Sequence, residues 1–120
     1  MSAAPPAATS NSATVTELPF PAVQSLVQAA KLGQQQDRPI QLDYYADTAL
    51  GKAVFAEDKD TKEKVLMKSR DEFTSLVQKV YKVPNAEDYL VLTENSIYLV
   101  SGKVQKRSMN LNEILGANDY

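Results

Sequence analysis

The sequence predicts an α+β fold, in which an antiparallel sheet of about five or six strands carries one or two packed helices and follows a flexible N-terminal arm. Three observations lead to this prediction. The first eighteen residues are almost entirely Ala, Pro, Ser, Thr and Asn. Two later stretches space their apolar residues as a helix does, and several short runs alternate or gather apolar residues as strands do. Short turns separate most of these runs, which favours antiparallel pairing.

The chain is expected to divide into four parts. Residues 1–18 cannot bury enough apolar surface to offset the entropy of ordering them, so they are expected to form a flexible arm. An amphipathic helix is expected at 19–33, the α+β domain at 39–115 and a short tail at 116–120. If the arm is a tether, its deletion should weaken assembly and leave the thermal midpoint almost unchanged.

The first predicted helix carries an apolar stripe at helical spacing. Its members are Phe20, Val23, Val27 and Ala30, with Leu26 beside them. Pro21 suits the first turn, and Gly33 suits the position just past the end. The stripe favours either packing on the chain's own domain or docking on a partner. For docking, the candidate contact residues are Phe20, Leu26 and Val27.

A change of period to two then predicts strands. Residues 40–46 alternate, so the adjacent Tyr44 and Tyr45 should point to opposite faces of a strand, one into the core and one outward. We take Tyr45 as a candidate partner contact, because tyrosine is enriched at interfaces. The runs 52–57 and 63–68, with a polar tip between them, predict a hairpin.

The stretch 69–82 is predicted to be the second helix. Ser69 and Glu72 match a capping box, and Pro84 would stop the helix. The expected apolar stripe consists of Phe73, Leu76, Val77, Val80 and Tyr81.

The remaining elements are strands and one helical turn. Strands are predicted at 89–93, 96–100 and 103–109, with tight turns between them. Asn110 then caps a short helical segment that ends near Leu115.

The composition argues against catalysis. The chain has no histidine and no cysteine, which excludes Ser-His-Asp and Cys-His mechanisms and thiolate or imidazole metal sites. The pair Asp58 and Asp60 weakly resembles the start of a calcium loop, but the pattern lacks its glycine, so a solvated hairpin tip is favoured. Asp43 and Asp47 are interpreted as surface charges. We therefore expect a non-enzymatic protein with no catalytic, cofactor-binding or metal-binding residues.

Charge limits the partners further. With 13 basic and 15 acidic residues, the net charge of −2 argues against nucleic acid as the main partner. No run is long and apolar enough to span a membrane. Lys103, Lys106 and Arg107 form a small basic patch that would either contact a partner or guard an exposed strand edge.

Two families provide resemblances. The stretch from Leu42 to Ser101 contains D-Y-Y-x-D, V-L-M-K-S-x-D-E-F-T-S and Y-L-V-L-T-E-N-S-I-Y-L-V-S, and it is similar to minor capsid proteins of large icosahedral DNA viruses. That resemblance implies a virion protein that joins capsid subunits. The run from Tyr89 to Val100, with Lys106-Arg107 after it, resembles the strand pairs of pleckstrin-homology-like domains. That resemblance implies a module that recognises a peptide or a lipid headgroup.

Together, the sequence predicts a structural or assembly protein that binds protein partners, possible capsid subunits among them. Its location would be the virion if the protein is viral, and the cytoplasm otherwise. The pleckstrin-homology-like binding module is the alternative.

Overall fold

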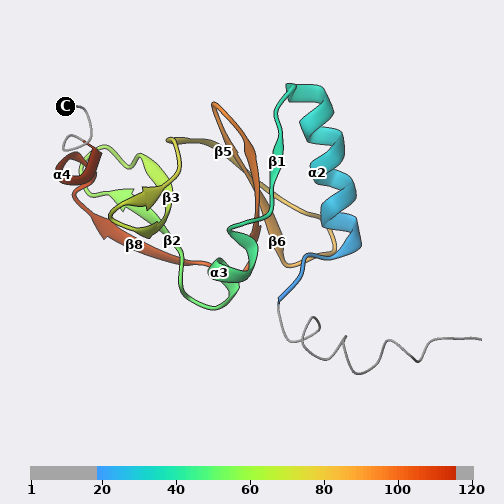
Figure 1. Cartoon of the computed structure of the whole chain (residues 1–120), viewed down its shortest axis with the longest axis horizontal. Coiled ribbons are helices and arrows are strands. Elements are labelled where there is room, and N and C mark those ends of the chain that lie inside the picture. Colours follow the sequence, from blue (N-terminus) through green and yellow to red (C-terminus); the bar gives the residue numbers. More distant parts are fainter. Residues whose placement is uncertain (1–18, 116–120) are drawn as a thin grey trace, which may run out of the picture.

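The structure is a computed structural model that describes residues 19–115, so the expected arm at 1–18 and tail at 116–120 lie outside the described residues (Figure 1). The elements in chain order are α2 (Val23–Gln36), β1 (Ile40–Gln41), α3 (Tyr45–Ala49), β2 (Val54–Asp58), β3 (Lys64–Ser69), β4 (Glu72–Phe73), β5 (Val77–Lys82), β6 (Asp88–Thr93), β7 (Ile97–Ser101), β8 (Gln105–Met109) and α4 (Leu111–Leu115).

The strands within 19–115 form two four-stranded sheets, and both sheets are mixed. Sheet I has the strand order β1-β7-β6-β5, and sheet II has the order β4-β3-β2-β8. Most neighbours are antiparallel, but β1 runs parallel to β7 and β2 runs parallel to β8. The predicted α+β class is confirmed. The predicted single antiparallel sheet of five or six strands is wrong, because the chain leaves sheet I after β7 and crosses to the edge of sheet II.

The layers follow one another in the order α2, sheet I, sheet II, α4 (Figure 1). Successive side chains of a strand point to opposite faces, and the inner strands β2, β3, β6 and β7 have consecutive apolar residues, so they supply apolar side chains to both faces. In β6, Leu90 and Leu92 face α2, whereas Val91 faces sheet II, where it meets Phe55 and Leu66. The far face of sheet II is covered by α4 through Leu111 and Ile114.

The α2 helix begins and ends a few residues later than predicted, and it packs through a different face. It continues through Gly33 to Gln36 and ends at Asp37, whose backbone is left-handed with φ 54°. The residues that it buries fully are Ser25 and Ala29, not the apolar stripe. Small side chains at these two positions let the helix axis approach sheet I closely, so the helix docks on its own domain and leaves the stripe outside.

The strand predicted at 40–46 is wrong beyond its first two residues. The chain turns at Leu42, whose carbonyl accepts the N–H of Tyr45, and then forms the short helix α3. The Thr48 hydroxyl donates to the Tyr44 carbonyl at 2.7 Å, which stabilises this turn. Both tyrosines are buried, because a helical turn does not send adjacent side chains to opposite faces of a sheet.

The helix predicted at 69–82 is also wrong; the segment forms β4, an irregular link and β5. The Ser69 hydroxyl does accept a backbone N–H, but from Asp71 within a turn rather than from a helix. Thr74 then ties the segment to β3, since its N–H donates to the Leu66 carbonyl and its hydroxyl accepts the Leu66 N–H. These hydrogen bonds to β3 replace the bonds that the segment would form within a helix.

The other predicted elements are confirmed. The strands β2 and β3 form the expected antiparallel hairpin, and so do β6 and β7. The last strand is shorter than predicted, at Gln105–Met109, and a helical turn follows it at Leu111–Leu115. The Asn110 side chain accepts the N–H of Asn112 at its start.

Candidate functional site

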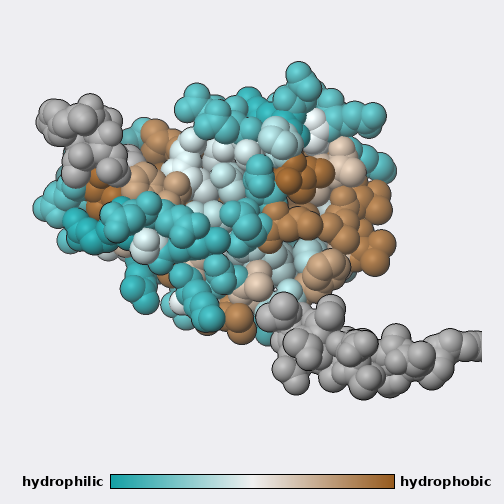
Figure 2. Space-filling model, in the orientation of Figure 1, coloured by the Kyte–Doolittle hydropathy of each residue, from teal (hydrophilic) through white to brown (hydrophobic). Residues whose placement is uncertain are grey.

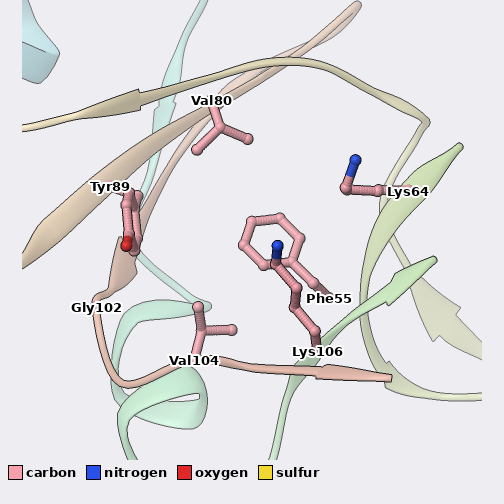
Figure 3. A pocket seen from close by; sticks show the side chains of 7 residues that line it. All are labelled: Phe55, Lys64, Val80, Tyr89, Gly102, Val104 and Lys106. Atoms are coloured by element: carbon pink, nitrogen blue, oxygen red, sulfur yellow. The ribbon is translucent and has the colours of Figure 1, made fainter. Parts of the chain in front are cut away.

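A pocket of about 340 Å³ opens between the two sheets. Seven residues line it: Phe55, Lys64, Val80, Tyr89, Gly102, Val104 and Lys106 (Figure 3). Val80 and Tyr89 belong to sheet I, and Phe55, Lys64 and Lys106 belong to sheet II. Gly102 and Val104 lie in the connection between β7 and β8. The volume lies at the lower end of the usual range for small-molecule sites, roughly 300–1,000 Å³.

The parallel pairing of β2 with β8 determines which basic residue reaches this pocket. Phe55 is the register partner of Lys106, so the two side chains project from the same face of sheet II. Arg107, one residue later, projects from the opposite face. Figure 3 shows the Lys106 ammonium group and the Phe55 ring on the same side of the sheet.

A tight turn forms one wall of the pocket. The Gly102 N–H donates to the Glu87 carbonyl at 2.6 Å, and a Cβ at position 102 would lie 2.4 Å from that oxygen. Any other residue there would clash with backbone, so glycine is required. The turn directs the chain from β7 to Val104 and then into β8.

The electrostatics of the pocket are simple. The Lys64 ammonium lies 3.4 Å from a Glu57 carboxylate oxygen, so its charge is partly balanced. Lys106 has no ion pair within residues 19–115. The lining includes no carboxylate, and the remaining groups are apolar side chains and the Tyr89 phenol. This arrangement suits binding of an anion with an apolar part better than proton transfer, which needs paired acid and base groups.

The acidic residues singled out in the sequence serve as ion partners elsewhere. The Lys68 ammonium lies 3.3 Å from Asp47, 3.6 Å from Glu72 and 3.9 Å from Asp43, and 4.5 Å from the centre of the Tyr44 ring. Burial lowers the pKa of Lys68, but the hydrogen bond to Asp47 and the neighbouring carboxylates outweigh it, so the net shift is upward. Burial, followed by the Glu72 charge, raises the pKa of the Tyr44 phenol.

Asp58 has a structural task at the hairpin tip. Its carboxylate accepts the N–H groups of Asp60 at 3.0 Å, Thr61 at 2.9 Å and Leu111 at 2.8 Å. Hydrogen bonds from the backbone of Thr61, then of Leu111, hold the pKa of Asp58 below its ordinary value. The carboxylate oxygens thus face mainly backbone donors, as in a hairpin tip rather than a calcium loop, but Asp58 itself is buried and not solvated as predicted.

A second buried carboxylate, at a position that no sequence pattern marked, holds α2 in place. Asp88 accepts the Ser25 hydroxyl at 2.6 Å, the Tyr45 hydroxyl at 2.5 Å and the Ala22 N–H at 3.1 Å. Burial, then the hydrogen bond to Asp88, raises the pKa of the Tyr45 phenol. Tyr45 is therefore a core residue, and the proposed partner surface does not include it.

The other predicted contact residues do not form one surface. Phe20 and Val27 are exposed, by 72% and 46%, while Leu26 is half-buried against the core under α2. Lys103 lines a hollow together with Phe20 and Leu50.

The predicted basic patch is not one patch. Lys103 lies in the hollow with Phe20, Lys106 lines the pocket between the sheets, and Arg107 lines a groove with Lys52 and Arg70 on the far side of sheet II. Alternation along β8 separates the last two. The pocket residues Val80 and Tyr89 were not predicted, because the pairing that gathers them joins segments far apart in the sequence.

Across 19–115, no three histidine, cysteine, aspartate or glutamate side chains gather as metal ligands would. Nor does this part of the chain contain a helix with the length and apolar character that a membrane crossing requires.

No family model, curated protein sequence or solved structure matches the chain.

Proposed function

We propose that this chain is a non-enzymatic assembly protein that binds other protein subunits through the outer face of α2. The observation that carries the proposal is the exposure of apolar side chains at the start of α2: Val23 and Val27 on the helix are 76% and 46% exposed, and Phe20, in the segment just before the helix, is 72% exposed. Figure 2 shows hydrophobic side chains gathered over the N-terminal half of this helix.

The stripe is not needed for the fold. The helix is already anchored on sheet I by Ser25 and Ala29, and its N-terminal end is held by Asp88. A helix fixed on one side presents its other side rigidly, so a partner would not have to order it on binding. This is the arrangement used in helix recognition, where apolar anchors recur at three- and four-residue spacing.

The surroundings of the stripe also suit an interface. Between Val23 and Gln36 the helix contains one charged residue, Lys31, and depletion of charge is typical of the centre of protein interfaces. Phe20 supplies an aromatic anchor beside it. Covering a valine or phenylalanine side chain contributes about 1.5–3 kcal/mol, so three such residues can support a specific contact.

The similarity of the stretch from Leu42 to Ser101 to minor capsid proteins supports capsid subunits as the partners and the virion as the place of action. The arm at 1–18, by its composition, would add a second, extended contact to a neighbouring subunit.

A site-specific photo-crosslinker tests this proposal. It is placed at Val23, on the stripe, and in a matched protein at Gln35, which is exposed on a different face of the same helix. With the native particles or extract, we expect one protein species to be crosslinked from position 23 and not from position 35. The purified partner should then bind the Val23→Glu variant about tenfold more weakly, which corresponds to about 1.4 kcal/mol. Equal crosslinking from both positions, or unchanged binding of the variant, would contradict the proposal.

A further inference from the structure

We propose that the pocket between the two sheets binds a small amphipathic carboxylate, with its apolar body between the sheets and its carboxylate at Lys106. This site is separate from the outer face of α2, because α2 covers the face of sheet I that points away from sheet II.

The pocket exists because the stacking of the sheets is incomplete at one corner. Phe55, Leu66 and Val91 fill the centre of the layer between the sheets. Toward β5 and β8 the lining side chains are the shorter Val80 and Val104, and the space between them stays open (Figure 3). Val80 keeps 41% of its surface exposed although it faces this space. An apolar ligand would cover that surface, which is favourable in water.

The positive charge at the pocket favours a negatively charged ligand. Lys64 is engaged by Glu57 at 3.4 Å, whereas Lys106 has no ion pair in the part of the chain that the structure describes. The lining contains two ammonium groups and no carboxylate. A positive site on a chain whose net charge is −2 is a local feature and not a consequence of composition.

The number and kind of donors favour a carboxylate over a phosphate. Only one of the two lysines is unbalanced within 19–115, and no arginine lines the pocket to provide the forked contact that phosphate groups commonly receive. The pocket volume of about 340 Å³ suits a single medium-length chain or one aromatic ring rather than a two-chain lipid.

Calorimetric titration of the full chain with decanoate, below its micelle concentration, tests the inference. We expect saturable binding at one site. The Lys106→Gln variant keeps a polar side chain and loses the charge, so its Kd should rise about tenfold. Arg107→Gln is the matched control: it removes one positive charge from the next residue of the same strand, on the opposite face of sheet II, and should leave the Kd unchanged. The neutral analogue decanamide should bind more weakly than decanoate, and equally to both variants.

Four results would overturn the inference. The first is no saturable binding of decanoate. The second is an equal loss of affinity in Lys106→Gln and Arg107→Gln, which would indicate general charge attraction. The third is binding to phosphatidylserine vesicles without binding to decanoate, which would assign Lys106 to a membrane surface instead. A further variant, Val104→Trp, should fill the pocket and abolish decanoate binding; retained binding would place the ligand elsewhere. None of these outcomes changes the crosslinking expected from Val23.

Discussion

Two buried aspartates at opposite ends of the described structure hold α2 and α4, the first and last helices that it describes. The two aspartates accept hydrogen bonds from different sets of donors. Asp88, at the start of β6, accepts two side-chain hydroxyl groups and one backbone N–H, and it anchors α2. Asp58, at the end of β2, accepts three backbone N–H groups and, at 3.3 Å, the Thr61 hydroxyl; the N–H of Leu111 among these donors ties it to the start of α4. Both residues are almost fully buried.

The difference shows how each end of the fold depends on the sequence. Backbone N–H groups remain whatever side chain is present, so the site around Asp58 is built mainly by the course of the chain. The hydroxyl groups around Asp88 belong to Ser25 and Tyr45 and can be removed individually. At the end of the molecule that carries the proposed interface, the hydrogen bonds that hold the helix can therefore be removed one at a time by substitution.

The largest effect is expected from Asp88→Ala. The substitution leaves the Ser25 and Tyr45 hydroxyl groups buried without their acceptor, so we expect a loss of about 3–5 kcal/mol of unfolding free energy. Urea unfolding followed by circular dichroism measures it. A loss below about 1 kcal/mol would mean that Asp88 does not anchor α2.

Truncation of one core side chain beside α2 and one beside α4 compares how firmly the two helices are held. Leu99→Ala removes a fully buried side chain from the core between α2 and sheet I, and should cost about 3 kcal/mol. Leu111→Ala affects the contact between α4 and sheet II, where a five-residue helix can shift into the space, so about 2 kcal/mol is expected. The same unfolding assay checks both. The reverse order would show that α4 is held more rigidly than α2.

Removal of single hydroxyl groups should have a smaller effect. Tyr45→Phe and Ser25→Ala each delete one donor to Asp88, and each should cost about 1–2 kcal/mol. Because the two donors share one carboxylate, the double variant should depart from additivity in a double-mutant cycle. Strict additivity would indicate that the two hydrogen bonds are independent.

The smallest effect is a pH dependence at the other aspartate. The pKa of Asp58 is lowered in the folded protein, so its contribution to stability is fully present above the unfolded value of about 3.9. That contribution is lost as the pH falls through the lower folded pKa. Unfolding measured from neutral to acidic pH should therefore show a smaller acid loss in Asp58→Asn than in the unaltered protein. Identical acid profiles would show that the carboxylate charge is not stabilised by the backbone donors.

The α+β class, the two hairpins and the last helical turn were predictable because each follows from a local pattern. The segment from Ser69 to Lys82 was not, because its apolar residues fit both periods. Val77 and Val80 are β-branched and suit a strand, but the S-x-x-E pattern suggested a helix. Pairing with β6 and the bonds of Thr74 to β3 decided between them, and neither can be read from the segment itself.

The candidate sites were predictable only in part, for a related reason. The sequence identified the α2 stripe but could not say which face of the helix docks on the sheet, because Ser25 and Ala29 attract no attention in a hydrophobicity pattern. It identified Lys106 but grouped it with Arg107. The parallel pairing of β2 with β8, which directs Lys106 into the pocket, joins segments about fifty residues apart.

The outward orientation of the α2 stripe is the claim on which the proposed function depends, and the unfolding free energies of two glutamate variants test it most directly. Val23→Glu adds a charge to an exposed position in the first turn and should change the unfolding free energy by no more than about 0.5 kcal/mol. Ala29→Glu forces a charge into the fully buried face and should cost more than about 3 kcal/mol. A large loss in Val23→Glu, or tolerance of Ala29→Glu, would show that the stripe packs on the chain's own domain.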